Sequence, residues 1–215
     1  MTHTLGVYLV TEARLSAGRS TVEIVEAAIR GGVDIVQLRE KETSVRDRYT
    51  LGKTLRRRTH DAEIPLIVND RVDLAAAIDA DGVHLGDDDL PVSVAREQLG
   101  DSAIIGRSVS TPEGAIEAER AGADYLGVGS VYGTTSKETD PEGSNIGLER
   151  IRKIRNATEL PFVGIGGVTP ENAQAVIEAG ADGVAVVSAI TAADDPETAA
   201  RRLESAVRAG RSGQP

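Results

Sequence analysis

Short apolar segments alternate with amphipathic segments from one end of the chain to the other. The apolar segments are almost continuously hydrophobic, which is typical of parallel strands buried on both faces. Between them, apolar residues recur at helical spacing, as at Val22, Val25 and Ile29. The pattern predicts eight strands with helices between them, within residues 6–11, 34–40, 65–70, 82–86, 103–109, 125–131, 161–168 and 183–189.

Helix boundaries carry their own signals. Ser20, Ser44, Thr111 and Thr169 each precede a helical pattern and are expected to cap it. A helix-to-strand junction recurs at residues 31–34, 121–124 and 179–182, with a looser copy at 80–82, and its glycine can end a helix in the left-handed conformation. Such recurrence indicates stacked βα units and predicts an α/β fold, a single (β/α)₈ TIM barrel. The rival, a flavodoxin-like open sheet, needs only five or six strands, so two predicted strands would have to be wrong.

The length of 215 residues fits one large domain, and no linker divides it. We expect a single barrel domain over residues 1–215, with residues 210–215 as a loose C-terminal tail. The absence of cysteine excludes disulfides and thiolate metal sites. No apolar run approaches the ~20 residues of a membrane span, and the first residues do not form a signal peptide, so a cytoplasmic protein is expected.

The chain is acidic, with a formal net charge of -10. An acidic surface repels nucleic acid and anionic lipid, so neither is an expected partner. Lysine is scarce beside arginine, aspartate crowds the loops, and large aromatic residues are few. This composition favours adaptation to high salt over ordinary acidic drift.

The second predicted strand ends in a polar and cationic row. Period-2 alternation places Gln37, Arg39 and Lys41 on one side. A guanidinium beside an ammonium group predicts an anion clamp, because both bind phosphate oxygens. The alternative is a structural ion pair with Glu40 or Glu42.

Carboxylates follow the third and fourth strands. Asn69 and Asp70 end the third strand, where such residues are often helix caps. His84 lies inside the apolar fourth strand, as a ligand-binding side chain or as a hydrogen-bonded core histidine, and Asp87 to Asp89 follow it. These aspartates could simply be solvated, but two carboxylates with phosphate oxygens make a typical Mg²⁺ site.

The later strands indicate a second anion site. Ser108 ends the fifth strand, and residues 133–137 form a donor-rich loop that ends in Lys137. Gly166 and Gly167 follow the seventh strand, where barrels of this fold often bind phosphate through backbone amides. A cationic site facing a neutral one predicts two phosphorylated substrates, with pyrophosphate as a leaving group.

Taken together, the motifs resemble those of thiamine phosphate synthase over nearly the whole chain. The matching residues, in order, are 37–41 (QLREK), 69–70 (ND), 82–86 (GVHLG), Asp89, Ser108, 134–137 (TTSK), 164–167 (GIGG) and 187–188 (VS). The resemblance implies that hydroxymethylpyrimidine diphosphate loses pyrophosphate, through a pyrimidine carbocation, and that a thiazole phosphate nitrogen attacks the methylene carbon. No nucleophilic side chain is then required, so the protein positions substrates and stabilises leaving-group charge.

The same resemblance assigns the site residues. It implies catalytic roles for Arg39, Lys41, Ser108 and Lys137, and Mg²⁺ ligation by Asp70 and Asp89. The pyrimidine diphosphate would be bound by Gln37, Leu38, Arg39, Glu40, Lys41, Asn69, His84, Ser108 and Lys137. The thiazole phosphate would be bound by Thr134, Thr135, Ser136, Gly167, Val187 and Ser188. Two positions depart from the family pattern. Ser136 and Gly133 change the usual Pro-Thr-x-Thr-Lys loop, and Asp87 replaces glutamine, which leaves the ligand choice among Asp87, Asp88 and Asp89 open.

Two other functions fit parts of the pattern. A thiazole tautomerase needs a proton carrier beside the thiazole, but His3, His60 and His84 all lie outside strands five to eight. A non-catalytic metabolite-binding barrel would need neither a metal pair nor a cationic clamp. The sequence leaves the oligomeric state open, and a homo-oligomer is compatible with it.

Overall fold

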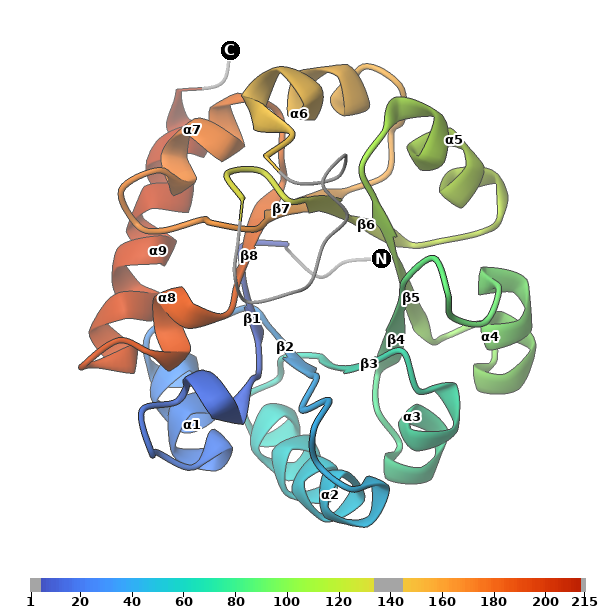
Figure 1. Ribbon diagram of the computed structural model, residues 1–215, viewed down its shortest axis with the longest axis vertical. Coiled ribbons are helices and arrows are strands. Elements are labelled where there is room, and N and C mark those ends of the chain that lie inside the picture. The colour runs from blue at the N-terminus through green and yellow to red at the C-terminus, as the bar shows by residue number, and fades with distance from the viewer. Residues whose placement is uncertain (1–4, 134–144, 214–215) are drawn as a thin grey trace.

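The computed structural model describes residues 5–133 and 145–213, and these residues form a closed parallel barrel (Figure 1). Each strand pairs with the next along the chain, and the last pairs with the first. The strands are β1 (Val7–Val10), β2 (Ile35–Leu38), β3 (Leu66–Asn69), β4 (Gly82–Leu85), β5 (Ile104–Val109), β6 (Tyr125–Gly129), β7 (Phe162–Ile165) and β8 (Gly183–Val186). All eight lie within the predicted segments, so the predicted TIM barrel is confirmed.

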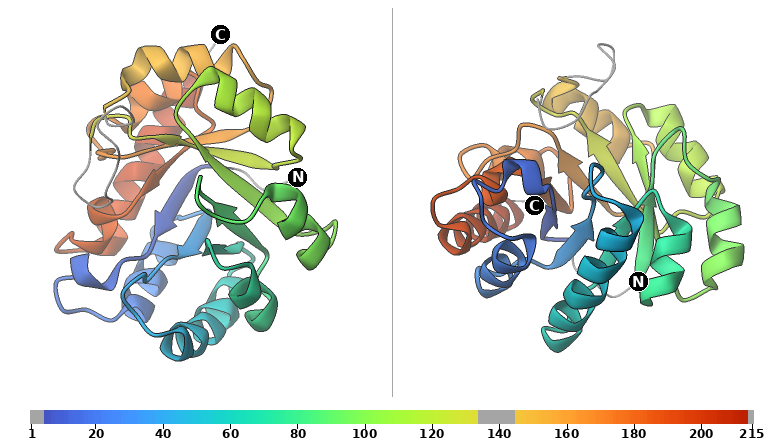
Figure 2. Two further views of the ribbon diagram at one scale, coloured as in Figure 1. Left: turned by 45° about the vertical axis from the view of Figure 1, so that its right-hand side comes forward. Right: turned by 60° about the horizontal axis from the view of Figure 1, so that its bottom comes forward.

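Helices surround the ring of strands on the outside (Figure 2). They are η1 (Ala13–Leu15), α1 (Thr21–Arg30), α2 (Val45–Asp61), α3 (Val72–Ile78), α4 (Val92–Leu99), α5 (Pro112–Arg120), α6 (Gly147–Arg155), α7 (Ala173–Glu178), α8 (Ser188–Thr191) and α9 (Pro196–Ser212). The last long helix, α9, packs against both α7 and α1, which closes the outer layer. Over the described residues, we find no helix with the length and apolar character needed to cross a membrane.

Three of the four predicted helix caps are confirmed. The side chains of Ser20, Ser44 and Thr111 accept hydrogen bonds from backbone amides in the first turns of α1, α2 and α5. The fourth is wrong, because α7 begins at Ala173 with Asn172 as its N-cap. The Asn172 side chain accepts from the Thr169 amide and donates to the Gly167 carbonyl, which holds a turn where a first helical turn was expected.

The prediction that a loose tail begins at residue 210 is wrong. Helix α9 continues to Ser212, and Gly210 is buried in it. A Cβ atom at Gly210 would lie 2.7 Å from Cβ of Ile177, so only glycine allows α9 to approach α7 this closely. The Arg211 guanidinium also donates to the Leu5 and Asp182 carbonyl oxygens. Packing therefore orders residues whose small and polar composition suggests a tail; residues 214 and 215 lie outside the described part.

The recurring junction has a structural role that the sequence does not reveal. Its aspartate precedes each even-numbered strand and accepts a hydrogen bond from a backbone amide near the start of the preceding odd-numbered strand. The pairs are Asp34 with Val7 (2.7 Å), Asp81 with Leu66 (2.7 Å), Asp124 with Ile105 (2.7 Å) and Asp182 with Phe162 (2.9 Å). The repeat thus joins the strands in pairs at the end of the barrel where they begin.

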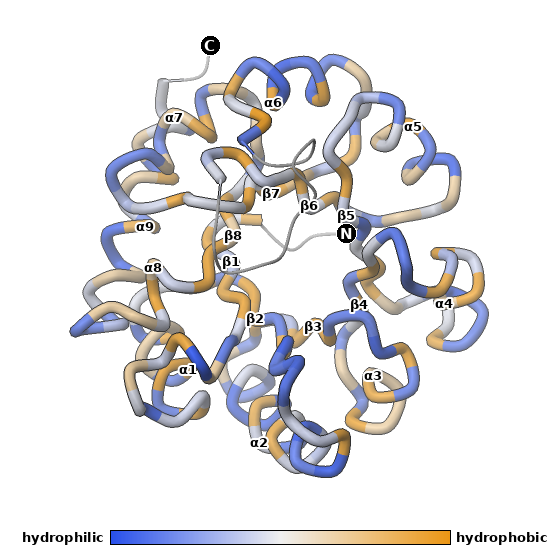
Figure 3. Tube along the Cα trace, viewed as in Figure 1, coloured by the Kyte–Doolittle hydropathy of each residue, from blue (hydrophilic) through white to orange (hydrophobic). Residues whose placement is uncertain are grey.

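The apolar side chains form two cores. The larger one lies between the strands and the helices, and the smaller one fills the barrel with residues such as Tyr8, Ile35, Ile67, Tyr125 and Val163. Figure 3 shows this arrangement as apolar strands inside a ring of helices with polar outer faces. Because side chains alternate along each strand, the inward positions beyond this filling, at the strand C-terminal ends, are available for a site.

Candidate active site

A polar layer covers the apolar filling of the barrel at the C-terminal ends of the strands. Gln37, Asn69 and Ser108 stand two or four positions beyond the inward-facing Ile35, Ile67 and Ile104 and therefore share their face. His84 lies on the same inner face, because its neighbours Val83 and Leu85 lie in the outer core. The side chains of Gln37, Asn69 and His84 are buried and Ser108 is half-buried. The structure thus brings together four residues that the sequence analysis placed at the pyrimidine site.

Hydrogen bonds connect three of these residues through two buried tyrosines. Gln37 Nε2 donates to the Tyr8 hydroxyl (2.8 Å), which lies 2.8 Å from the Tyr125 hydroxyl. The Tyr125 hydroxyl lies 3.0 Å from His84 Nδ1, and His84 Nε2 lies 2.9 Å from Ser108 Oγ. Of the two alternatives for His84, the structure therefore shows a hydrogen-bonded histidine, but one whose chain of contacts ends in the polar layer.

The two cations that follow β2 are both paired with carboxylates. Arg39 Nη1 lies 2.5 Å from Oε2 of Glu12, and the side chains are only 10% and 2% exposed. Lys41 is more open and its Nζ lies 2.9 Å from Oδ2 of Asp70. Both cations are therefore in ion pairs, but their partners are Glu12 and Asp70 and not Glu40 or Glu42.

Asp70 and Asp89 face each other across the ends of β3 and β4. Asp70 has φ +63°, a left-handed conformation that non-glycine residues adopt mainly where the surroundings hold them in it. Asp89 Oδ2 accepts a hydrogen bond from the Gly86 amide (2.6 Å). Burial and the neighbouring Asp70 carboxylate raise the pKa of Asp89, against the lowering effects of the Gly86 amide and the Lys41 ammonium. The two carboxylates are therefore close enough to repel each other.

The other two aspartates of this loop have different surroundings. Asp87 pairs with Arg107 Nη2 at 2.7 Å, and its side chain is 90% exposed. Asp88 is also exposed. Of the three candidates that the sequence left open, only Asp89 is turned toward Asp70. No group of three or more histidine, cysteine, aspartate or glutamate side chains suited to a metal exists within residues 5–133 and 145–213.

Across the barrel mouth, glycines shape the ends of β6 and β7. Gly166 and Gly167 have φ +98° and +65°. A Cβ atom at Gly166 would lie 2.2 Å from Ser130 Oγ, and one at Gly167 would lie 2.4 Å from the Gly133 carbonyl oxygen. Ser130 Oγ is buried and lacks a hydrogen-bond partner among the described residues. Val187 precedes the short helix α8, whose first residue is Ser188.

Some predicted site residues are not brought into this layer. The Leu38 side chain lies in the outer core, where it contacts α2 near Gly52. The Glu40 carboxylate turns toward the chain outside the barrel and accepts from the Ala13 amide and the Thr21 hydroxyl. Thr134, Thr135, Ser136 and Lys137 lie outside the described residues.

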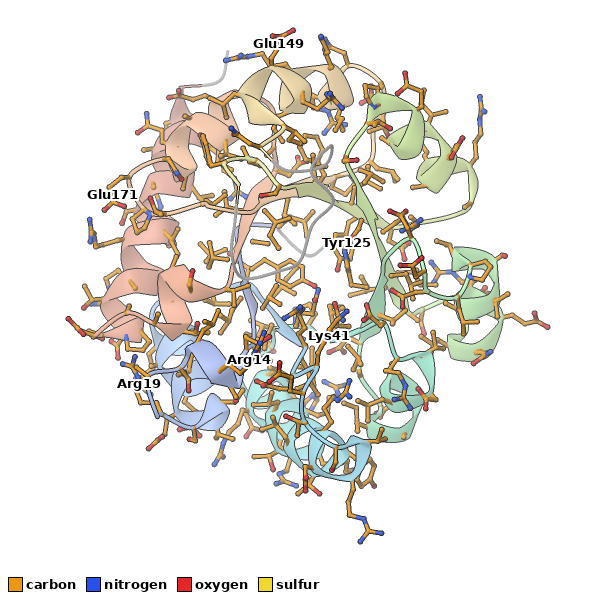
Figure 4. All side chains as sticks on the ribbon, in the orientation of Figure 1. Arg14, Arg19, Lys41, Tyr125, Glu149 and Glu171 are labelled. Carbon is orange, nitrogen blue, oxygen red and sulfur yellow. The ribbon has the colours of Figure 1, made fainter. Side chains whose placement is uncertain are left out.

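Three contributors were missed by the sequence analysis: Tyr8, Tyr125 and Glu12. Figure 4 shows Tyr125 inside the ring of strands and Lys41 near β2 and β3. A signal for the tyrosines exists, since both interrupt aliphatic strand segments in a chain with only four tyrosines. Glu12 carried no comparable signal, because its partner Arg39 is distant in sequence.

Comparison with known proteins agrees with this geometry. The family model described as thiamine monophosphate synthase matches residues 7–190. The chain belongs to the thiamine monophosphate synthase family. It is 74% identical over 207 residues to the thiamine-phosphate synthase of Natronomonas pharaonis, covering 96% of this chain and 97% of that one. The corresponding protein of Haloarcula marismortui is 63% identical over 206 residues, with 95% and 98% covered.

A solved structure of the family has the same fold. Thiamine phosphate pyrophosphorylase from Pyrococcus furiosus superposes with a TM-score of 0.88 at 42% identity, covering 97% of this chain and 98% of that one. The two curated relatives, at 74% and 63% identity over nearly the whole chain, are both thiamine-phosphate synthases. The chain is therefore a transferase with thiamine-phosphate synthase activity.

Proposed function

We propose that the polar layer and the carboxylate pair bind hydroxymethylpyrimidine diphosphate, and that the thiazole phosphate binds opposite, at the ends of β7 and β8. This proposal rests mainly on one observation: Lys41, Asp70 and Asp89 lie close together at the strand ends where the polar layer with Ser108 is found. Cations, carboxylates and hydroxyls at one rim suit a diphosphate, whereas a mainly apolar ligand would shield these groups from water without offering them a polar contact.

The pyrimidine diphosphate is bound through two kinds of contact. Gln37 and Asn69 line the buried side and present polar groups to the heteroaromatic ring, and His84 lies beside them with its ring nitrogens hydrogen-bonded to Tyr125 and Ser108. Lys41, 46% exposed, reaches the rim where phosphate oxygens would lie, and Ser108 stands between the ring and the rim. Arg39, held by Glu12, adds positive charge beneath the site. Lys137 is proposed to contact the same diphosphate.

The donor set at Asp70 and Asp89 fits Mg²⁺. Two carboxylates are too few for a protein-only site, but Mg²⁺ takes one or two carboxylates together with substrate phosphate oxygens and water. Burial and then the Asp70 carboxylate raise the pKa of Asp89, and a cation between the two carboxylates would relieve their repulsion. When bound, Mg²⁺ would neutralise charge that develops on the departing pyrophosphate.

The thiazole phosphate is proposed to bind at the glycines of β7 and at the start of α8. Barrels of this fold commonly bind a phosphate after strands seven and eight. Gly166 and Gly167 bring backbone close to β6 without side chains in the way, and Val187 and Ser188 lie on the neighbouring strand end. Thr134, Thr135 and Ser136 are proposed to complete this half.

The protein's part in the reaction is positioning and charge stabilisation. The bond between the pyrimidine methylene carbon and the diphosphate oxygen breaks, and the thiazole nitrogen forms the new bond to that carbon. Fixed donors at Lys41, Arg39 and Ser108 stabilise the leaving pyrophosphate without reorganising. Facing sites hold the two substrates in the geometry of attack.

A coupled assay tests this assignment. With Mg²⁺ and both substrates, we expect pyrophosphate and thiamine phosphate to form in equal amounts, and no thiamine phosphate when either substrate is omitted. Binding of the thiazole phosphate without pyrophosphate release would instead favour a non-catalytic barrel. Isomerisation of a thiazole phosphate in the absence of the pyrimidine would favour a tautomerase, although the structure places no histidine on the described parts of β5 to β8.

The acidic surface is proposed to adapt the enzyme to high salt. The formal charge of -10 and the relatives from Natronomonas and Haloarcula, both halophilic, support this proposal. Raising KCl from dilute to molar should increase Tm by at least about 3 °C, roughly 1 kcal/mol in a chain of this size, because salt screens carboxylate self-repulsion. Thermal melts followed by circular dichroism would measure it.

A variant and an osmolyte control separate screening from other effects of salt. Neutralising the exposed Glu97 and Asp101 as Glu97→Gln and Asp101→Asn should raise Tm in dilute buffer and reduce the gain from KCl. Sucrose at equal osmolality stabilises through exclusion from the surface and should not distinguish the variant from the parent. A Tm that is flat or falls with KCl would rule out the adaptation.

A further inference from the structure

We propose that Tyr125 is a positioning residue: it fixes which nitrogen of His84 carries the proton, and His84 thereby turns the Ser108 hydroxyl proton toward the leaving diphosphate. This inference rests on the proposed function, because it takes Ser108 as a diphosphate contact. It concerns a buried chain of hydrogen bonds that runs from Gln37 through Tyr8, Tyr125 and His84 to Ser108, called the polar chain below.

The polar chain crosses the barrel interior. Its members come in order from β2, β1, β6, β4 and β5, and successive heavy atoms lie 2.8, 2.8, 3.0 and 2.9 Å apart. Tyr8 and Tyr125 are almost completely inaccessible. Burial raises the pKa of both phenols above the usual value for tyrosine, so each keeps its proton and remains a donor.

The direction of the polar chain follows from its amide end. Gln37 Nε2 can only donate, so the Tyr8 oxygen accepts from it. Among the described residues the Tyr8 hydroxyl has one other partner, Tyr125, and using its own proton requires donation to the Tyr125 oxygen. A buried hydroxyl proton left unpaired would be costly.

The requirement that each buried hydroxyl donates its proton also sets the direction of the remaining hydrogen bonds. The Tyr125 oxygen has accepted from Tyr8, so its proton goes to His84 Nδ1. A nitrogen that accepts carries no proton, and the neutral imidazole must carry its proton on Nε2. Nε2–H donates to Ser108 Oγ, which leaves the serine proton free to point into the barrel mouth. In the opposite tautomer, Ser108 would donate to His84 and present only lone pairs to an anionic substrate.

The strands are shaped to hold this chain. A Cβ atom at Gly106 would lie 2.2 Å from Tyr125 Cζ and 2.4 Å from His84 Nδ1. One at Gly127 would lie 2.9 Å from His84 Cε1. Glycine at both positions makes room for the two rings, whose centroids are 5.4 Å apart. The histidine and the tyrosine therefore have fixed places, which a tautomer-setting contact requires.

The decisive measurement is the tautomer of His84 in the free protein. Two-bond ¹⁵N–¹H correlation spectra of protein labelled in its three histidines distinguish Nε2–H from Nδ1–H, with His84→Gln assigning the signal. In the parent protein we expect Nε2–H alone. In Tyr125→Phe, Nδ1 has lost its donor, and an Nδ1–H population should appear.

Tyr8→Phe is the matched control. It also removes one buried phenol hydroxyl, but the Tyr125 hydroxyl can still donate to His84 Nδ1. The control should therefore retain Nε2–H even if its Tm falls as much as that of Tyr125→Phe. A change of tautomer in Tyr125→Phe alone would show that the effect comes from the polar chain and not from loss of packing.

Kinetics connects the tautomer to the reaction. Tyr125→Phe should lower kcat about tenfold or more, the scale of losing a donor to a developing anion, with smaller changes in the KM values. Ser108→Ala should have a similar effect. If both act through the same proton, the double variant should be no slower than Ser108→Ala, whereas independent effects would multiply.

Three results would overturn the proposal. One is an Nδ1–H tautomer in the parent protein, which would mean that the polar chain runs in the opposite direction. Another is a Tyr125→Phe variant with an unchanged tautomer. The third is a changed tautomer with an unchanged kcat, or with an effect that multiplies with Ser108→Ala. Failure of the parent to release pyrophosphate would contradict the proposed function itself, and the tautomer would still be measurable.

Discussion

Asp70→Asn is expected to lower kcat/KM by at least about a hundredfold, equivalent to about 2.7 kcal/mol of transition-state stabilisation. The substitution keeps the shape of the side chain but removes one of the two carboxylate charges. Two such charges ~5 Å apart repel by roughly 3 kcal/mol at an effective dielectric near 20, and a divalent cation turns that cost into attraction. The same substitution releases Lys41 from its pair with Asp70. Steady-state pyrophosphate release would measure the loss.

The metal and the neighbouring loop supply the controls. Excess Mg²⁺ should recover part of the Asp70→Asn loss, and EDTA should abolish activity of the parent enzyme. Asp88→Asn is a matched control, because Asp88 belongs to the same loop but its side chain is exposed. It should therefore matter much less than Asp89→Asn, which removes the carboxylate beside Asp70. Full activity in EDTA would contradict the metal-assisted mechanism. A larger defect at Asp88 than at Asp89 would move the proposed ligand.

Arg39→Ala is expected to destabilise the protein by about 3 kcal/mol, the lower end of the range for breaking a buried ion pair by removing one partner. Its Glu12 partner, 2% exposed, would keep only its contact at 3.2 Å with Arg14, whose side chain is 54% exposed and only weakly compensates a buried charge. Lys41→Ala removes an equal charge, but from a side chain that is 46% exposed, and should change stability by no more than about 1 kcal/mol. Urea unfolding of the two variants would measure the difference.

Activity measurements and a double variant distinguish the effect of Arg39 on stability from its effect on substrate charge. Both single substitutions should lower turnover at least about tenfold where the protein remains folded, because each removes positive charge near the diphosphate. Combining Arg39→Met with Glu12→Gln removes both buried charges and should recover much of the stability lost in Arg39→Ala, but not the activity. Equal losses of stability in Arg39→Ala and Lys41→Ala would show that the buried pair is not what distinguishes them.

The strands were predictable because their signal is local. Each consists of a short apolar segment that needs burial on both faces, and eight of them with helices between leave few arrangements other than a closed barrel. Helix starts at Ser20, Ser44 and Thr111 were predictable for the same reason, since the capping side chain binds an amide three residues away. At Thr169 the local signal failed, because the Asn172 side chain stabilises a competing turn.

The site was partly predictable by topology. The position of Gln37, Asn69, His84 and Ser108 at strand ends, together with the family motif, assigned them to one site, and all four meet in the polar layer. Leu38 and Glu40 were included through the family motif, although their side chains point away from the barrel interior. A motif marks a stretch of chain as a unit, whereas a strand divides that stretch between two faces.

The sequence by itself determined the barrel, the acidic surface and the strand ends at which polar residues gather, because hydrophobic periodicity and charge are properties of neighbouring residues. Only the tertiary structure decided the partners. Glu12 meets Arg39, and Asp34 caps Val7, across 27 positions each. Tyr8 meets Tyr125 across 117. Closure of the barrel brings such residues within hydrogen-bond distance. No local sequence pattern specifies which distant side chain will become the partner.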